Sequence, residues 1–265
     1  MAAGRGWYGS GMHLRHAAKR ATQSVFGAFG LEVRRRRTPP SPRRPDPHAT
    51  LGAHVAALLA RERVDCVIDV GAHEGGFGRL VRSNGWTGQI VSFEPVAASF
   101  DRLAAATAGD PLWSVNRIAL GRASGRRRIN VTGGTVFSSF LEPSAAGSEL
   151  WPEWMAHVAD EEVEIRRLDE VLREATGDPA LERIFLKLDT QGFDLEVFAG
   201  AAGVLDKIVG LQSELSLRPI YEGMPTYLEA LQAFQATGFA MTGIYPVTRD
   251  PEWRIVECDA VMIRA

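Results

Sequence analysis

From residue 50 onward, short apolar runs alternate with segments in which apolar residues recur at the three- to four-residue spacing of a helix. The runs predict buried strands, and the periodic segments predict helices. Helices are predicted at Leu51–Arg61 and after Gly76. Strands are predicted at Cys66–Val70, Ile90–Phe93, Trp113–Ile118, Arg183–Leu188, Ile208–Ser213, Phe239–Tyr245 and Asp259–Ile263. This alternation is typical of an α/β fold whose parallel sheet carries helices on both faces.

The first 49 residues predict two regions that precede this domain. Residues 1–37 are basic, and apolar residues at helical spacing between Met12 and Phe29 predict an amphipathic helix there. Residues 38–49 are rich in proline, which cannot continue a helix, and predict a semi-rigid linker. We therefore expect one α/β domain over residues 50–265.

An insertion follows the third predicted strand. Residues Arg126–Phe140 are polar and predict a hairpin or lid. Trp151, Trp154 and Met155 lie further along the chain, before the fourth strand, and have two alternatives: an apolar wall beside a site, or ordinary buried packing. The alternatives differ in how exposed these three side chains are.

The composition is that of a folded globular protein, with 45% hydrophobic and 23% charged residues in a chain of 265. No apolar run approaches the roughly 20 residues that span a bilayer. The apolar stretch from Val25 to Leu31 is too short for a signal peptide and is followed by four arginines. We therefore expect a protein that neither spans a membrane nor is exported.

The net charge of −2 conceals a basic tail. The first 50 residues carry ten Lys or Arg against two acids, a net of +8 that leaves −10 on the rest. One interpretation is a solvated tail, and the other is peripheral contact with the anionic inner face of a membrane. No nucleic-acid partner is expected, and the oligomeric state is left open.

Cysteine and histidine usage favours a cytoplasmic protein without a zinc site. Cys66 and Cys258 lie in apolar runs and are expected to be buried free thiols, which suits a reducing compartment. The six histidines are scattered along the chain without the clustering of a zinc site. No metal is expected, with oxygen-ligated magnesium at Asp189 as the alternative.

A glycine-rich segment, DVGAHEGG at residues 69–76, follows the first strand and opens a helix. Glycines there let the backbone approach a ligand closely, and a helix N-terminus presents free N–H groups. His73 stands where the dinucleotide motif G-x-G-x-x-G needs its second glycine, which disfavours a pyrophosphate cofactor. A tight turn without a ligand is the alternative.

Two more acids end predicted strands. Glu94, in Phe93-Glu94-Pro95, ends the second strand, where a carboxylate can accept both hydroxyls of a ribose. Asp189 ends the strand at 183–188. Because the carboxyl ends of parallel strands meet at one edge, both acids and Asp69 are expected to converge on one crevice. Asp194 and Glu196 come after Gly192 and are expected to favour a helix N-terminus.

These motifs, in this order, resemble the FkbM-type methyltransferases of the class I S-adenosylmethionine-dependent fold. The resemblance covers about residues 64–265 and rests on the segments at 69–75, 93–95, 119–121, 168–172 and 187–197. It implies a Rossmann-like sheet of seven strands, mostly parallel, with the last strand, Asp259–Ile263, antiparallel. The family commonly has Asn where this chain has His73.

The resemblance also implies a set of site residues around S-adenosylmethionine. The methionine end would meet Asp69, Gly71, Ala72 and Gly75, the ribose would meet Glu94 beside Pro95, and the adenine would be flanked by Asn116 to Ala119. A loop at the carboxyl rim generally shapes the acceptor pocket, which makes Tyr221 and Glu222 candidate acceptor-binding residues. Asp189, Glu214 and His73 are the candidate general bases, and Asp189 is preferred.

The sequence therefore predicts an S-adenosylmethionine-dependent O-methyltransferase that acts on a hydroxyl of a small acceptor. A sugar of a glycolipid, polysaccharide or glycosylated metabolite comes first because of the family, ahead of an amino group or a polyketide-type hydroxyl. A nucleotide-dependent oxidoreductase or epimerase is opposed by the altered glycine motif and by the lack of a Tyr-x-x-x-Lys pair. A non-catalytic binding module is opposed by the presence of Asp69, Glu94 and Asp189 together.

Overall fold

The structure, a computed structural model, describes residues 50–178 and 180–265. The predicted basic segment at 1–37 and the linker at 38–49 lie outside the described residues. Within the described part, no helix has the length and apolar character needed to cross a membrane.

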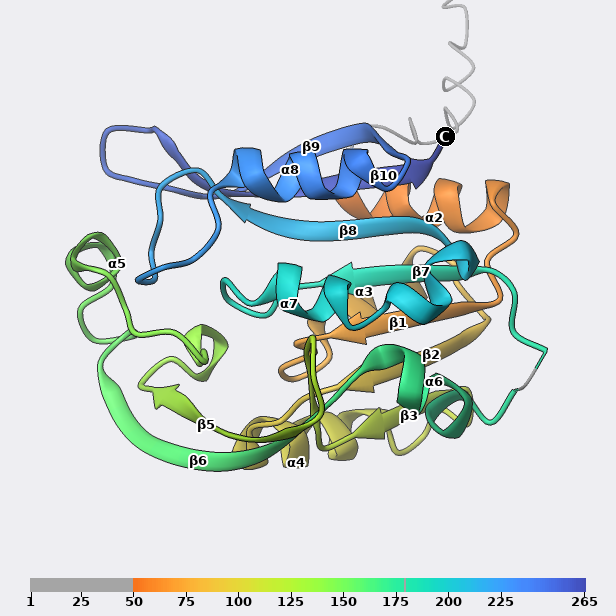
Figure 1. Ribbon diagram of the computed structural model, residues 1–265, viewed down its shortest axis with the longest axis horizontal. Helices are drawn as coiled ribbons and strands as arrows, with labels where there is room; N and C mark the ends of the chain where they lie inside the picture. Colours follow the sequence, from red (N-terminus) through yellow and green to blue (C-terminus); the bar gives the residue numbers. More distant parts are fainter. Residues whose placement is uncertain (1–49, 179) are drawn as a thin grey trace, which may run out of the picture. The chain divides into compact units, whose positions relative to one another are not determined.

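A seven-stranded sheet forms the centre of the domain, in the order β3-β2-β1-β7-β8-β10-β9 (Figure 1). Five neighbouring strands run parallel: β1 (Cys66–Val70), β2 (Gln89–Phe93), β3 (Trp113–Asn116), β7 (Ile184–Leu188) and β8 (Ile208–Ser216). β10 (Ile255–Arg264) lies antiparallel between β8 and β9 (Phe239–Arg249). The predicted α/β class, the parallel sheet and the antiparallel last strand are confirmed.

The two central strands explain why the sheet could be found from apolar runs. Every residue of β1 and of β7 is buried, because helices cover both faces of the sheet. One face packs against α2 (Leu51–Arg61), α3 (Gly76–Ser83) and α4 (Ala97–Thr107), and the other against α6 (Leu168–Thr176), α7 (Asp194–Ala199) and α8 (Tyr227–Ala236). Successive residues of β1 alternate between these two cores, with Val67 in the first and Ile68 in the second.

Local signals set the ends of several helices. The side chain of Thr50 accepts a hydrogen bond from the backbone N–H of Ala53 and begins α2. Thr226 and Glu229 form a reciprocal capping box at the start of α8. Gly177, in the left-handed conformation with φ 66°, ends α6.

A second, three-stranded sheet is built from β4 (Ala119–Leu120), β6 (His157–Arg166) and β5 (Gly125–Thr132), in the order β4-β6-β5. We call residues 125–166 the insert; they also contain the short helices η1 (Thr135–Phe137) and α5 (Ala145–Leu150). The hairpin or lid predicted at Arg126–Phe140 is present in part. Asn130 and Ser139 form an antiparallel bridge within this segment, but the strand that pairs with β5 along its length is β6.

The insert contains the three residues for which the sequence left two alternatives: Trp151, Trp154 and Met155. Met155 is buried, and the ring of Trp151 packs 5.1 Å from that of Phe137. Trp154 is 57% exposed. None of these three side chains lines the cavity described below, so the interpretation as an apolar wall beside the site is wrong.

Candidate active site

A cavity of about 630 Å³ opens at the carboxyl ends of the parallel strands. One side is formed by the turn after β1, the end of β2, the connection from β3 to β4 and the turn after β7, and the insert forms the other side. Six of the residues predicted from the sequence line it: Gly71, His73, Glu94, Pro95, Ala119 and Asp189. The expected crevice at this edge of the sheet is therefore present.

The turn after β1 brings β1 and β7 into close contact at Gly71. The φ of Gly71 is +73°, and a Cβ placed there would lie 1.8 Å from the carbonyl oxygen of Asp189. Its N–H bonds to the carbonyl of Phe93 at 3.1 Å. Only glycine fits both the conformation and the space, so the chain can pass from β1 into the cavity wall without a side chain intervening.

Glu94 turns its carboxylate back toward two backbone N–H groups at the cavity wall. Its Oε2 accepts from His73 N at 2.8 Å and its Oε1 from Val96 N at 2.9 Å. The residue is only 6% exposed. Burial raises the pKa of Glu94 to about 7, against the opposing effect of the two N–H donors. A carboxylate with fixed orientation therefore borders the cavity.

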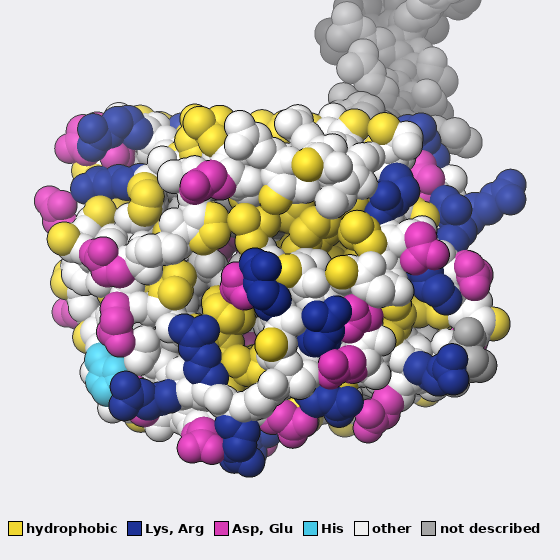
Figure 2. All heavy atoms as spheres, in the orientation of Figure 1, with side chains coloured by type: hydrophobic (Ala, Val, Ile, Leu, Met, Phe, Trp, Pro, Cys, Tyr) yellow, Lys and Arg dark blue, Asp and Glu magenta, His cyan; other side chains and the backbone are white. Residues whose placement is uncertain are grey.

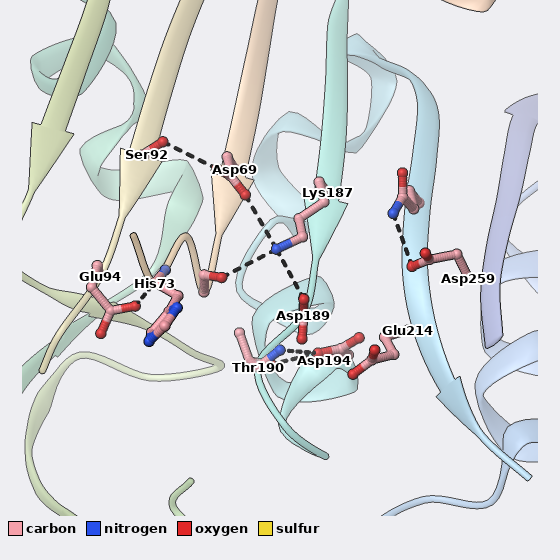
Figure 3. A network of polar contacts seen from close by, with 12 residues as sticks. Asp69, His73, Ser92, Glu94, Lys187, Asp189, Thr190, Asp194, Glu214 and Asp259 are labelled. Atoms are coloured by element: carbon pink, nitrogen blue, oxygen red, sulfur yellow. Dashed lines mark hydrogen bonds and ion pairs between the residues drawn. The ribbon is translucent and has the colours of Figure 1, made fainter. Parts of the chain in front are cut away.

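Lys187 joins the ends of β1 and β7 through three contacts (Figure 3). Its ammonium lies 3.3 Å from Asp69 Oδ1 and 3.2 Å from Asp189 Oδ2, and it donates to the carbonyl of Gly71 at 3.1 Å. Burial alone would lower the pKa of Lys187, but Asp189 and Asp69 reverse this effect and hold the pKa above its ordinary value. Lys187 is thus a buried cation that ties two carboxylates together.

The three acids predicted to converge do so at different depths. Asp69 is fully buried, and Ser92 Oγ donates to its Oδ2 at 3.2 Å. The side chain of Asp189 is 30% exposed and lines the cavity. Asp69 therefore lies under the cavity floor, which corrects its predicted place on the cofactor surface, while Asp189 and Glu94 reach the cavity as predicted.

His73 connects the turn to the insert. It has a φ of 48°, and its Nε2 lies 2.7 Å from Thr135 Oγ1. Arg102 also donates to this hydroxyl at 3.3 Å and forms an ion pair with Glu74. Burial lowers the pKa of His73 below its ordinary value, so the imidazole favours its neutral form.

Three residues predicted to contact the cofactor do not line the cavity. Ala72 is buried in the apolar core beside α2 and α3. A Cβ on Gly75 would meet Leu103 at 2.9 Å, so this glycine serves the packing of the turn. The side chain of Asn116 turns away from the cavity toward the carbonyl of Ser92 at 3.4 Å.

The two residues predicted to bind the acceptor lie outside the lining of the cavity. Tyr221 is 1% exposed, and its hydroxyl is held by Gln191 and by the carbonyl of Phe137. Glu222 is exposed but does not line the cavity. Glu214, a predicted base, lies behind the wall and bonds to Gln191. Asp194 accepts from Thr190 and Ser213 and holds the turn before α7, in line with its predicted structural role.

Two residues that organise the site were missed. Lys187 interrupts an otherwise apolar strand, and a charge there is costly unless it is paired, so its position was a usable signal. Gln191 carries no comparable signal, because its partners Asp189, Glu214 and Tyr221 come together only in the fold.

Within the insert, exposed ion pairs join β5 to β6. Arg126 pairs with Glu162 at 2.5 Å and Arg128 with Asp160 at 3.4 Å across β5 and β6, and all four side chains are more than a third exposed. Figure 2 shows side chains of both signs interspersed over this face of the molecule. Exposed pairs of this kind contribute little to stability.

Comparisons with known proteins agree with this geometry. A sequence profile described as the methyltransferase FkbM domain matches residues 69–241, which is more than half of the chain. This chain is similar to 2-O-methyltransferase NoeI of Sinorhizobium fredii, with 27% identity over 205 residues, covering 71% of this chain and 80% of NoeI. It is also similar to methyltransferase sdnD of Sordaria araneosa, with 29% identity over 153 residues, covering 51% of this chain and 59% of sdnD.

Among solved structures, the chain is similar to magnesium protoporphyrin IX methyltransferase (ChlM) from Synechocystis with bound SAM. The identity is 10%, the TM-score is 0.43, and the match covers 81% of this chain and 78% of ChlM.

Proposed function

The chain belongs to the FkbM family of S-adenosylmethionine-dependent methyltransferases, and we propose that the group it methylates is a hydroxyl of a sugar. The observation that carries this proposal is the carboxylate of Asp189, which is 30% exposed at the cavity wall. A hydroxyl must lose its proton when its oxygen is methylated, so a carboxylate in the cavity suits this acceptor. The similarity to a 2-O-methyltransferase supports the same acceptor class.

The lining of the cavity fits S-adenosylmethionine in its chemistry. Ile118, Ala119 and Phe140 line an apolar part that suits an adenine ring, and Glu94 borders the same cavity with a carboxylate that suits ribose hydroxyls. At Gly71 the backbone itself forms the wall.

We assign the roles of the chain's residues as follows. Glu94 accepts the ribose hydroxyls, and the backbone of Gly71 lies against the methionine end. The cofactor, when bound, would supply an electrophilic methyl group on a positively charged sulfur, with S-adenosylhomocysteine as the leaving group. Asp189 takes the proton of the acceptor hydroxyl, and Lys187 keeps that carboxylate in place. The insert excludes water from the cavity.

His73 and Glu214 are the weaker candidates for the base. The imidazole of His73 is engaged with Thr135 at 2.7 Å. Burial, with a further contribution from Asp189, raises the pKa of Glu214 well above its ordinary value, so it favours the protonated form. Neither group presents a partly exposed carboxylate to the cavity as Asp189 does.

The experiment that tests the acceptor class is methyl transfer from S-adenosyl-[methyl-³H]methionine to a panel of defined acceptors. The panel holds methyl glycosides, oligosaccharides, a polyprenyl-phosphate-linked sugar, a primary amine and a phenolic or polyketide-type alcohol. We expect label on a sugar hydroxyl, identified by NMR of the product. Label only on the amine, or only on the non-sugar alcohol, would overturn the sugar assignment.

Replacing Glu94 by alanine is expected to weaken binding of S-adenosylmethionine by about 10- to 150-fold, the loss of roughly 1.5–3 kcal/mol for hydrogen bonds to a charged group. Isothermal titration calorimetry measures this change. Glu182→Ala, at an exposed glutamate outside the cavity, is the matched control. Unchanged affinity in Glu94→Ala would remove Glu94 from the cofactor site.

Cofactor binding by the unmodified protein is expected to weaken as the pH falls below about 7. Burial raises the pKa of Glu94 to about 7, and protonation removes acceptor sites that the ribose hydroxyls need. Affinity is therefore highest where Glu94 is ionised, above this pKa. The same titration repeated with Glu94→Gln, which cannot ionise, should show a flatter pH dependence. An equally steep dependence in Glu94→Gln would assign the effect to another group.

A further inference from the structure

Gln191 lies at the centre of a buried hydrogen-bond network behind the cavity wall. It belongs to the turn after β7, is 9% exposed and has a φ of 53°. A residue with a side chain rarely adopts this left-handed conformation without support. The hydroxyl of Ser139, from the insert, donates to the carbonyl of Gln191 at 2.7 Å. The backbone of Gln191 is therefore held against the insert.

The side-chain amide of Gln191 directs both of its hydrogens at carboxylates. Nε2 lies 2.9 Å from Asp189 Oδ1 and 2.9 Å from Glu214 Oε2. The two acids follow a paired position of neighbouring strands, Leu188 of β7 and Ser213 of β8. Without the amide, no donor would lie between the two carboxyl groups.

Tyr221 contacts the oxygen end of the Gln191 amide. Its hydroxyl lies 2.9 Å from Gln191 Oε1 and 2.9 Å from the carbonyl oxygen of Phe137 in the insert. Burial raises the pKa of Tyr221, so the phenol keeps its hydrogen and serves as a donor. The phenol has one hydrogen, which these two acceptors share. The amide nitrogen faces the carboxylate of Asp189, which can only accept, and this leaves the amide oxygen to face the phenol.

The carboxylate of Asp189 is consequently held at both oxygens. Lys187 lies 3.2 Å from Oδ2, and Gln191 donates to Oδ1. Rotation of the carboxylate would break one of these contacts. We propose that Gln191 is a positioning residue, which orients the Asp189 carboxylate toward the acceptor hydroxyl and separates it from Glu214. This inference rests on the proposed role of Asp189 as the base.

Charged and titratable groups act on Asp189 from every element around it. They are Asp69 of β1, His73 of the glycine turn, Lys187 of β7, Asp194 of α7, Glu214 of β8, and Glu257 and Asp259 of β10. Lys187 is the single cation in this set. If a donor is lost from Asp189, or an anion is added beside it, Lys187 is therefore the one cation left in this set to oppose the change.

The test compares how the rate of methyl transfer depends on pH in the unmodified protein, in Gln191→Glu and in Gln191→Met, with the labelled cofactor and a sugar accepted in the panel above. We expect kcat near neutral pH to fall by about 10-fold or more in both variants. The acidic limb of the profile, where the rate falls as the pH is lowered, should move to higher pH in both variants and further in Gln191→Glu. The KM for the cofactor should change little.

Tyr221→Phe should shift this acidic limb in the same direction but by less. The matched control Gln232→Glu, an exposed glutamine on α8, leaves the profile unchanged.

A purely structural role for Gln191 would lower thermal stability without moving the limb, and that result would overturn the proposal. A second measurement, carboxyl ¹³C NMR, needs no acceptor. The Asp189 resonance is identified as the signal that disappears in Asp189→Asn. We expect this resonance to titrate at higher pH in Gln191→Met than in the unmodified protein. An unmoved titration also counts against the proposal. Full turnover in Asp189→Asn would overturn the role of Asp189 as the base. If Asp189→Asn lost turnover but both Gln191 variants kept the pH profile of the unmodified protein, only the role of Gln191 would be overturned.

Discussion

Asp189→Asn is expected to lower turnover by about 10²- to 10⁴-fold, the usual contribution of a positioned general base. Asparagine keeps the size of the side chain but cannot take up the proton of an acceptor hydroxyl. Affinity for the cofactor should change little, because Glu94 and the backbone at Gly71 remain in place. Steady-state rates at saturating cofactor, together with calorimetric titration of S-adenosylhomocysteine, separate the two effects.

The matched control for this variant is Asp206→Asn, at an exposed aspartate of η2 (Ala202–Lys207). It should leave both turnover and affinity unchanged. If Asp189→Asn turned over at the unmodified rate, the base would have to be sought elsewhere, and His73 would be the first alternative because it also lines the cavity. A thermal melt of each variant checks that loss of rate is not loss of fold.

Lys187→Met is expected to lower the free energy of unfolding by about 3–5 kcal/mol, the cost of breaking a buried ion pair by removing one partner. Methionine fills nearly the same volume but leaves Asp69, which is fully buried, facing Asp189 without a cation. Denaturant unfolding measures the loss. Lys207→Met is the matched control, since Lys207 pairs with a Glu182 side chain that is 73% exposed, and such pairs contribute at most about 1 kcal/mol.

The defect in Lys187→Met should also depend on pH with a definite sign. Burial raises the pKa of Asp69 above its ordinary value, and Lys187 opposes this rise. Once the lysine is gone, folded Asp69 binds its proton still more tightly than unfolded Asp69. A carboxyl with the higher pKa in the folded state loses stability as pH rises between its unfolded and folded values. We therefore expect the smallest defect in mild acid, and partial recovery at neutral pH in the double variant with Asp69→Asn. Equal defects at both pH values would contradict this account.

The sequence predicted the central strands well because burial on both faces leaves an unbroken apolar run. The bounds of β1 were predicted without error, and β7 starts one residue later than expected, at Ile184. The strands toward the far edge were predicted too short. β10 begins at Ile255 instead of Asp259, because pairing with β9 extends it through Glu257, a residue whose charge gives no strand signal.

β6 was missed for a related reason. Its first residues are exposed and acidic, so their alternation is weak until Val163 and Ile165, which are buried. What makes the segment a strand is the pairing with β5, where arginines lie opposite acids. That pairing joins residues far apart in the chain and cannot be deduced from either segment alone.

In the site, the sequence predicted which strand ends meet but not where each side chain points. Strand order along the chain was enough to bring Glu94 and Asp189 to one edge of the sheet. The direction of each side chain was not predictable: Asn116 turns away from the cavity, and the hydroxyl of Tyr221 is taken up by Gln191. Both residues were assigned to the site from their place in a segment. The partner that holds each side chain comes from another part of the chain and cannot be identified from that segment.

The burial of the two cysteines makes this protein a convenient background for site-selective labelling. Cys66 and Cys258 are the only cysteines of the chain, and burial raises their pKa values to about 12 and about 11, so reactive thiolate is scarce at neutral pH. A cysteine introduced at Val158, which is 65% exposed at the start of β6, would be the thiol that a maleimide fluorophore meets first. With a second dye on α8, fluorescence energy transfer would report any movement of the insert when a ligand binds. The native cysteines would not have to be removed.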